Sequence, residues 1–299
     1  MKAYPKLPEF DYVKPESYEE ATQFLVSHAG EARPFTGGTD LFVQMRDRLY
    51  KPKYLVDIKS LEGTDQISFD PSQGLTIGAG VNMNRVIAHP EVREHYHILA
   101  ESAESVASYQ LRSRATIVGN ICNASPAGDT IGACLLLDGM LSVFGEGGER
   151  QEPLSTFFLG PGKTTLRTGD IVTAIRFPVP LQGLKGRYLK LGRNQLSDLS
   201  IVGVTAVGYP EVGMQSGYRF RLALASVAPV PLVVDQVEEI LGREPVSEDS
   251  LRQAAEMAME TSTPIDDVRG SARYRKLMVR NLSYNALKDV WAQLNEHAN

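Results

Sequence analysis

Two glycine turns, far apart in the sequence, constrain the fold of this chain more than any other feature. The first turn consists of Thr36, Gly37, Gly38, Thr39 and Asp40, and the second consists of Thr116, Ile117, Val118, Gly119 and Asn120. Each lies between an apolar run and a helix-like run, so its backbone N–H groups can point at an anion. Taken singly, each is most simply a left-handed turn at the start of a helix. Taken together, they favour a grip on one long ligand with a central pyrophosphate.

The residues around the first turn predict a β–turn–α–β unit. Ser17 and Glu20 have the spacing of a capping box, so a helix is expected to begin there. A short strand at 33–35 leads into the turn, Asp40 is a candidate cap for the next helix, and a second strand follows at 54–58. In that next helix the apolar positions recur every fourth residue, at Leu41, Met45 and Leu49. Open α/β units bind ligands at the crevice where these glycines lie.

The sequence beyond residue 58 predicts a second unit of strands and helices, followed by a separate domain. Strands are expected at 75–80, 140–144, 149–154 and 171–177, and helices at 82–88, 91–107 and 131–136. Prolines at 178 and 180 stop the last strand, so we expect a first domain at 1–177, with subdomains of about 1–58 and 59–177, and a second domain at 178–299. The second domain has expected strands at 186–192, 200–209 and 217–228 and expected helices at 232–242, 247–261 and 272–294. A three-stranded antiparallel sheet with helices on one face would make it a small α+β domain.

Two further glycine motifs lack residues that the nucleotide chemistry they suggest would need. Residues 78–80 begin like a dinucleotide fingerprint, but Met83 stands where the third glycine is required, so they are interpreted as a strand end. Residues 160–164 resemble the end of a P-loop, but Phe157 stands where the first glycine is required, and a turn and a strand follow instead of a helix. The sequence therefore argues against a nucleotide triphosphatase.

Charge and cysteine content argue against several other functions. The formal net charge of −5 and the isoelectric point of about 5.6 disfavour nucleic acid or an anionic membrane as the main partner. Cys122 and Cys134 cannot hold an iron–sulfur cluster by themselves, and the close pair His95 and His97 has no third ligand nearby. Without a signal-like N-terminus or a run long enough to cross a bilayer, the chain is expected to be metal-free and cytoplasmic.

Several segments, in order along nearly the whole chain, resemble one enzyme family. They lie at 36–41, 110–129, 157–164, 188–193, 228–231 and 271–275. These segments are similar to the FAD-binding medium subunit of the molybdenum hydroxylases, the family of xanthine dehydrogenase and carbon monoxide dehydrogenase. The resemblance implies an α+β fold, with a two-part FAD-binding domain of the PCMH/VAO type followed by a smaller α+β domain of the carbon monoxide dehydrogenase flavoprotein type.

The resemblance also implies where FAD would bind. Both glycine turns, at 36–40 and 116–120, would hold the FAD pyrophosphate. Asp129 matches an acid that contacts the flavin in relatives, and Lys190 matches a lysine that does so. Val172 occupies a position that touches FAD by packing in relatives. A positive charge at Lys190 would stabilise negative charge on the flavin ring.

Two positions qualify this implied site. The second turn of the family has two glycines, and Val118 replaces the first of them, so its side chain must point away from the phosphate or the turn must shift. Asp198 lies in the segment 191–199, which passes close to the flavin in relatives and affects access of NAD. Asp198 could influence the electron acceptor through its charge, or it could serve only as a turn residue.

The function implied by the resemblance is electron transfer within an enzyme complex. In the family a large subunit carries the molybdopterin, a small subunit carries two [2Fe-2S] clusters, and the medium subunit passes electrons through FAD to an acceptor such as NAD. We expect a dimer of heterotrimers and no catalytic acid or base in this chain. The Gly-Gly-Thr-Asp of the first turn favours a xanthine dehydrogenase type acting on a purine or N-heterocycle. The alternatives are a carbon monoxide, aldehyde or aromatic-CoA dehydrogenase or reductase, a stand-alone flavin oxidase, and a module that binds or stores FAD.

Overall fold

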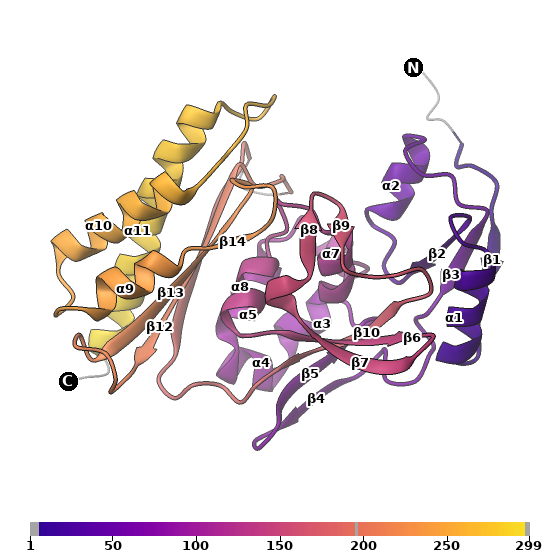
Figure 1. The fold of residues 1–299 in the computed structure, drawn as a ribbon, viewed down its shortest axis with the longest axis horizontal. Helices are drawn as coiled ribbons and strands as arrows, with labels where there is room; N and C mark the ends of the chain where they lie inside the picture. The colour runs from indigo at the N-terminus through magenta and orange to yellow at the C-terminus, as the bar shows by residue number, and fades with distance from the viewer. Residues whose placement is uncertain (1–5, 195–196, 297–299) are drawn as a thin grey trace.

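The structure, a computed structural model, describes residues 6–194 and 197–296 and is built around three main sheets (Figure 1). A three-stranded sheet from the N-terminal part lies at one end of the molecule. A five-stranded sheet with its helices lies in the middle, and a four-stranded sheet with the C-terminal helices lies at the other end. The α+β class predicted from the sequence is confirmed.

The first sheet contains the predicted β–turn–α–β unit. Its strands are parallel in the order β1-β3-β2, so β2 and β3 flank α2 as expected. The elements are β1 (Asp11–Val13), α1 (Tyr18–Ser27), β2 (Ala32–Phe35), α2 (Leu41–Arg46) and β3 (Tyr54–Asp57). Ser17 caps α1, because its hydroxyl accepts a hydrogen bond from the N–H of Glu20 at 3.1 Å. The Glu20 carboxylate accepts from the N–H of Glu16, so the reciprocal half of the expected capping box is absent here.

Two expectations for α2 are wrong. Asp40 precedes the helix but makes no side-chain capping bond, because its own backbone is already helical at φ −84° and ψ −43°. Leu49 lies beyond the end of α2 and is 73% exposed, so it does not belong to the buried face. Met45 is fully buried and packs in a small cluster with Phe35 and Leu55.

The second sheet is antiparallel and runs in the order β4-β5-β10-β6-β7. Its strands are β4 (Ile67–Asp70), β5 (Gly74–Gly78), β6 (Met140–Gly145), β7 (Gly148–Pro153) and β10 (Ile171–Phe177). Its helices are α3 (Met83–Ala88), α4 (Pro90–His95), α5 (His97–Glu104), α6 (Tyr109–Arg112), α7 (Ile117–Asn123) and α8 (Ile131–Leu136). A 3₁₀ turn, η1 (Leu154–Thr156), and a small hairpin of β8 (Phe158–Gly160) and β9 (Lys163–Thr164) follow β7.

The helix expected at 91–107 is interrupted at Tyr96. This residue leaves the helical region, at φ −130° and ψ 40°, and its ring is 1% exposed. Its hydroxyl donates to the carbonyl of Pro178 at 2.9 Å. The buried ring and this long-range bond therefore override the helical pattern of the local sequence.

The C-terminal sheet has the three predicted antiparallel strands and one more. The order is β11 (Lys185–Leu191), β12 (Val202–Pro210), β13 (Tyr218–Ala225) and β14 (Leu232–Val233). The predicted helix at 232–242 begins later, at Asp235, because Leu232 and Val233 pair with β13 as an edge strand. Three helices, α9 (Asp235–Gly242), α10 (Glu248–Thr261) and α11 (Ala272–Glu296), cover one face of the sheet (Figure 1).

The other face of the C-terminal sheet packs against α5 and α8 of the middle part. A Cβ at Gly132 on α8 would lie 2.5 Å from the Thr205 hydroxyl of β12, and a Cβ at Gly186 on β11 would lie 2.9 Å from Ile98 of α5. Because both faces are covered, β12 is buried along almost its whole length. The C-terminal sheet is thus closely packed against the part of the chain that carries Asp129.

Candidate functional site

The two glycine turns come together where the first sheet meets the second. The hydroxyl oxygens of Thr36 and Thr116 lie 3.3 Å apart, although the residues are 80 positions apart in the sequence. A Cβ at Gly37 would lie 2.1 Å from the carbonyl oxygen of Arg114, so the two backbones touch at a point where only glycine fits. A Cβ at Gly119 would lie 3.6 Å from the Thr36 hydroxyl. The turns therefore form one continuous surface.

Both turns contain backbone N–H groups that have no hydrogen-bond partner among the described residues. The described residues include no acceptor for the N–H groups of Gly38 and Thr39, just before α2, or of Ile117 and Val118, at the start of α7. Such groups at a helix start bind anions through their N–H dipoles. Two sets of these donors on one surface fit the two phosphates of a pyrophosphate.

The second turn is the first turn of α7. Thr116 is its N-cap, and the threonine hydroxyl accepts from the N–H of Gly119 at 2.9 Å. Val118 is 4% exposed, and its side chain belongs to the core of the second sheet. The side chain thus points into the core and away from the unpaired N–H groups, so a valine at position 118 is compatible with an anion at this turn.

A buried acid lies on the far side of this surface, next to the C-terminal sheet. Asp129 is 7% exposed, and its carboxylate accepts from the Tyr188 hydroxyl at 2.6 Å and from the Lys190 ammonium at 2.7 Å. The Lys190 ammonium also donates to the carbonyl of Ser105 at 3.2 Å. Burial raises the pKa of Asp129, and the nearby charge of Lys190 offsets part of that increase. Burial also raises the pKa of Tyr188 well above its usual value.

Asn120 connects the second glycine turn with this buried acid. Its side-chain oxygen accepts from the Thr130 hydroxyl at 2.8 Å, and Thr130 follows Asp129 directly. The predicted residues thus form a continuous path from Thr36 through Thr116 and Asn120 to Asp129 and Lys190. The path runs from the end of β2 past α7 to β11 and suits an elongated ligand.

Three further residues named from the sequence, Val172, Asp40 and Asp198, are not part of this path. Val172 on β10 is 4% exposed, pairs with Val143 across the sheet and lies in its core. Asp40 is exposed beside the first turn. Asp198 accepts from the N–H of Arg193 at 2.7 Å and from its guanidinium at 3.3 Å, and this partner lowers the pKa of Asp198 to about 2. The geometry of Asp198 supports a turn residue whose charge is already paired; residues 195 and 196 of its segment lie outside the described residues.

The sequence did not single out Tyr188 and Ser105 as members of the site. Tyr188 and Lys190 alternate along β11, so they share one face of the strand and both reach Asp129. The spacing of two in a predicted strand was the available signal. Nothing local marks Ser105, which contributes only its carbonyl group.

Other features of the described chain do not suggest a second reaction centre. Burial raises the pKa of the Cys122 thiol to about 12, so it is not a reactive thiolate. Within residues 6–194 and 197–296 no group of three or more His, Cys, Asp or Glu side chains could hold a metal ion, and no helix has the length and apolar character needed to span a bilayer.

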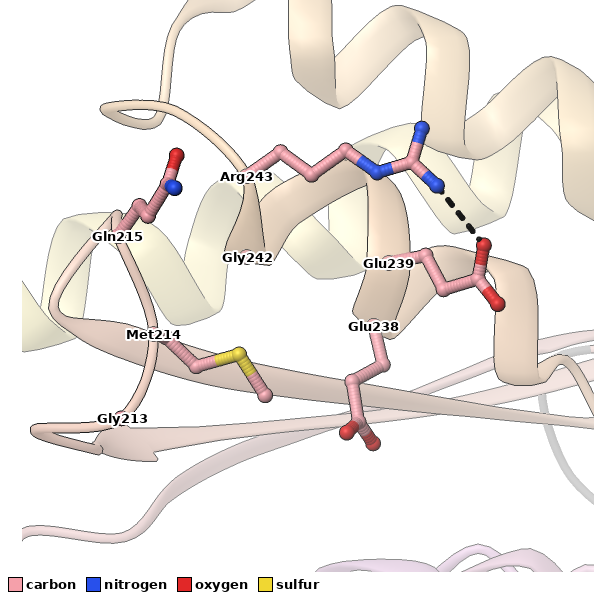
Figure 2. A pocket seen from close by; sticks show the side chains of 7 residues that line it. All are labelled: Gly213, Met214, Gln215, Glu238, Glu239, Gly242 and Arg243. Atoms are coloured by element: carbon pink, nitrogen blue, oxygen red, sulfur yellow. Dashed lines mark hydrogen bonds and ion pairs between the residues drawn. The ribbon is translucent and has the colours of Figure 1, made fainter.

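A surface hollow of about 310 Å³ lies on the C-terminal domain. In its lining Met214 faces α9, and Arg243 pairs with Glu239 (Figure 2). A second hollow, of about 510 Å³, lies between α10 and α11, with Arg252 and Tyr284 in its lining. None of the predicted site residues lines either hollow. We therefore assign the candidate site to the surface between the glycine turns and Asp129.

Comparison with known proteins covers nearly the whole chain. Residues 8–180 match the family described as FAD binding domain in molybdopterin dehydrogenase, and residues 187–290 match the CO dehydrogenase flavoprotein C-terminal domain. The medium chain of carbon monoxide dehydrogenase from Hydrogenophaga pseudoflava is 30% identical over 286 residues, which are 96% of this chain and 98% of that protein. The xanthine dehydrogenase FAD-binding subunit of Escherichia coli is 26% identical over 269 residues, 90% of this chain and 91% of that protein.

Comparison of the fold with solved structures also finds a carbon monoxide dehydrogenase. The solved structure of carbon monoxide dehydrogenase from Hydrogenophaga pseudoflava, in a form that lacks the Mo-pyranopterin moiety of its cofactor, matches with a TM-score of 0.91 at 30% identity. The match covers 96% of this chain and 99% of that one.

Proposed function

Because this chain belongs to the family of FAD-binding medium subunits of the molybdenum hydroxylases, we propose that its two glycine turns, Asp129 and Lys190 form one FAD site. The contact between Thr36 and Thr116 carries this proposal, since it brings the two sets of unpaired N–H donors together. In this arrangement residues 36–40 and 116–120 bind the pyrophosphate. Val172 would contact FAD by packing.

The residues of this chain would bind and orient the cofactor, and they would not perform acid or base chemistry. When bound, FAD would accept electrons from the [2Fe-2S] clusters of a partner subunit and pass them to an acceptor such as NAD. Lys190 would place a positive charge at the flavin end of the site, and Asp129 and the Ser105 carbonyl hold its ammonium in place.

We propose two partner chains, a large subunit with molybdopterin and a small subunit with two [2Fe-2S] clusters, in a dimer of heterotrimers. The cysteine content supports this, because Cys122 and Cys134 alone cannot hold a cluster. We also propose the division into domains 1–177 and 178–299, with subdomains of about 1–58 and 59–177; residues 1–5 and 297–299 lie outside the described part of the chain.

For the substrate of the complex we propose a purine or another N-heterocycle, as in xanthine dehydrogenases. The sequence Gly-Gly-Thr-Asp in the first turn supports this class. The alternative is a carbon monoxide, aldehyde or aromatic-CoA enzyme, and the 30% identity to a carbon monoxide dehydrogenase medium chain favours the first of these. A stand-alone flavin oxidase is a further alternative, which would need its own substrate base.

Purification of the chain on its own and from its native cells tests this function. Alone, it should be yellow, contain FAD in an amount equal to that of the protein, and oxidise no purine, aldehyde or other small organic substrate. From native cells, a tagged chain should bring with it a molybdopterin-containing chain and a cysteine-rich chain, and the purified complex should oxidise its substrate. Oxidation of an organic substrate by the chain alone would favour the oxidase alternative, and purification without partners at native expression would contradict the subunit role.

A further inference from the structure

A buried arginine in the C-terminal domain lies at the end of a hydrogen-bond network that reaches the Asp129 loop. Arg275, near the start of α11, is 1% exposed. Its Nη1 donates to the carbonyl of Ser226 at 2.9 Å, and its Nη2 lies 2.5 Å from the carboxylate of Asp267. Burial of an unpaired guanidinium is costly, so these two partners fix the side chain in one orientation.

Ser226 is held in an unusual backbone conformation. Its φ of +68° lies in the left-handed region, where a side chain such as serine is disfavoured. Such a conformation persists where the surroundings determine it from several sides. Around Ser226 they do, since its hydroxyl donates to the carbonyl of Ser200 at 2.9 Å and lies 2.8 Å from the Ser200 hydroxyl, while Arg275 binds its carbonyl.

The remaining donors of this network point at the residues that precede Asp129. The N–H of Ser226 donates to the carbonyl of Pro126 at 2.7 Å, and the Ser200 hydroxyl lies 3.3 Å from the carbonyl of Ala127. The C-terminal domain thus holds the loop 126–129 through two consecutive carbonyl groups, and Ser226 is the link between that loop and Arg275.

From these contacts we propose that Arg275 is a positioning residue for FAD: acting through Ser226 and Ser200, it fixes the loop 126–129 and thereby the Asp129 carboxylate beside Lys190. The inference rests on the proposed FAD site. Arg275 lies outside that site and acts on FAD only through the loop. Its guanidinium suits this role because its planar fork binds the Ser226 carbonyl and Asp267 in fixed directions, which the flexible ammonium of a lysine does not reproduce.

The test compares Arg275→Lys with the matched variant Arg280→Lys on the same helix, measuring the dissociation constant for FAD in the purified chain. Arg280 pairs with Glu256 at the surface at 3.3 Å. We expect Arg275→Lys to weaken FAD binding by about tenfold or more, since it misplaces hydrogen bonds to a charged group, and Arg280→Lys to leave it unchanged. If Arg275→Lys does not fold, Ser200→Ala is used in its place. It removes the hydroxyl that lies between Ser226 and the Ala127 carbonyl, and it should weaken FAD binding in the same way.

A pair of double variants separates positioning from a general loss of structure. In the Asp129→Asn background, Arg275→Lys should have little further effect on FAD affinity, because its route through Asp129 is already lost. In the Thr36→Val background it should keep its full effect. Equal effects in both backgrounds, or unchanged affinity in Arg275→Lys, would overturn the inference and leave the FAD site standing. A wild-type chain that does not bind FAD would overturn the proposed function and the inference together.

Discussion

Replacement of Gly37 by valine is expected to weaken FAD binding by about a hundredfold or more. A Cβ at this position would lie 2.1 Å from the carbonyl oxygen of Arg114 and 3.2 Å from the Cα of Ala115, and both are backbone atoms that cannot rotate away. The two glycine turns must then move apart. Loss of two hydrogen bonds to a charged phosphate, at about 1.5–3 kcal/mol each, corresponds to a weakening of about a hundredfold or more.

The matched control for this variant is Gly147→Val in the hairpin between β6 and β7. A Cβ at Gly147 would meet no atom within 4 Å, and its backbone is not left-handed. We expect this control to bind FAD like the wild type. Titration of both proteins with FAD, with circular dichroism to show that each is folded, makes the comparison. A folded Gly37→Val protein with wild-type affinity would mean that the contact between the turns does not form the site.

Replacement of Lys190 by methionine is expected to produce the second largest effect, on stability and on FAD affinity together. Asp129 would remain buried without its counter-charge, although the Tyr188 hydroxyl would still donate to it. Removing one partner of a buried ion pair costs about 3–5 kcal/mol of unfolding free energy. Because methionine has a similar length, the loss would reflect the charge more than the packing.

The stability lost in Lys190→Met should increase as the pH rises from acid to neutral. Burial already raises the pKa of Asp129, and removal of the Lys190 charge would raise that pKa further. A raised folded-state pKa gives stability that is present below the unfolded value, about 4, and is lost as the pH rises through the folded value. The free energy of unfolding of the variant should therefore be close to that of the wild type in acid and much lower than that of the wild type at neutral pH.

Urea unfolding across this pH range measures the effect. The double variant Lys190→Met with Asp129→Asn should regain most of the lost stability at neutral pH, since no charge is then buried alone. Lys53→Met, which removes a lysine from an exposed pair with Glu31, is the control and should leave the unfolding free energy nearly unchanged, because solvent screens an exposed ion pair. If Lys190→Met lowers the unfolding free energy by the same amount at all pH values, the charge of Asp129 is not the cause of the lost stability.

Much of the fold could be predicted from local sequence patterns. The Ser17 cap, the strands around the first turn and the hairpin at 140–154 all carry strong short-range signals, and all are present. The elements that differ depend on partners far away in the chain. β14 is two residues long and exists only by pairing with β13, and the break at Tyr96 is fixed by a buried ring and a bond to Pro178.

The candidate site likewise has parts that local sequence could predict and parts that depend on distant residues. The glycine turns were visible because threonine and glycine at a helix start have a local meaning. Their contact was not visible, because it joins residues 80 positions apart. The bond between Tyr188 and Asp129 spans 59 positions, and the bond between Arg275 and Ser226 spans 49. Local patterns predicted the two glycine turns, and the resemblance supplied Asp129, Lys190 and Val172. Tertiary packing provides the contacts that join the turns, Asp129 and Lys190 into one path.

The most direct test of the proposed FAD site is a crystal structure of the chain with FAD bound. We expect pyrophosphate oxygens within hydrogen-bond distance of unpaired backbone N–H groups from both glycine turns, at residues 38–39 and at residues 117–118. We also expect the flavin at the end of the site where Asp129 and Lys190 lie. FAD bound to one turn alone, or in a hollow of the C-terminal domain, would contradict the proposed site.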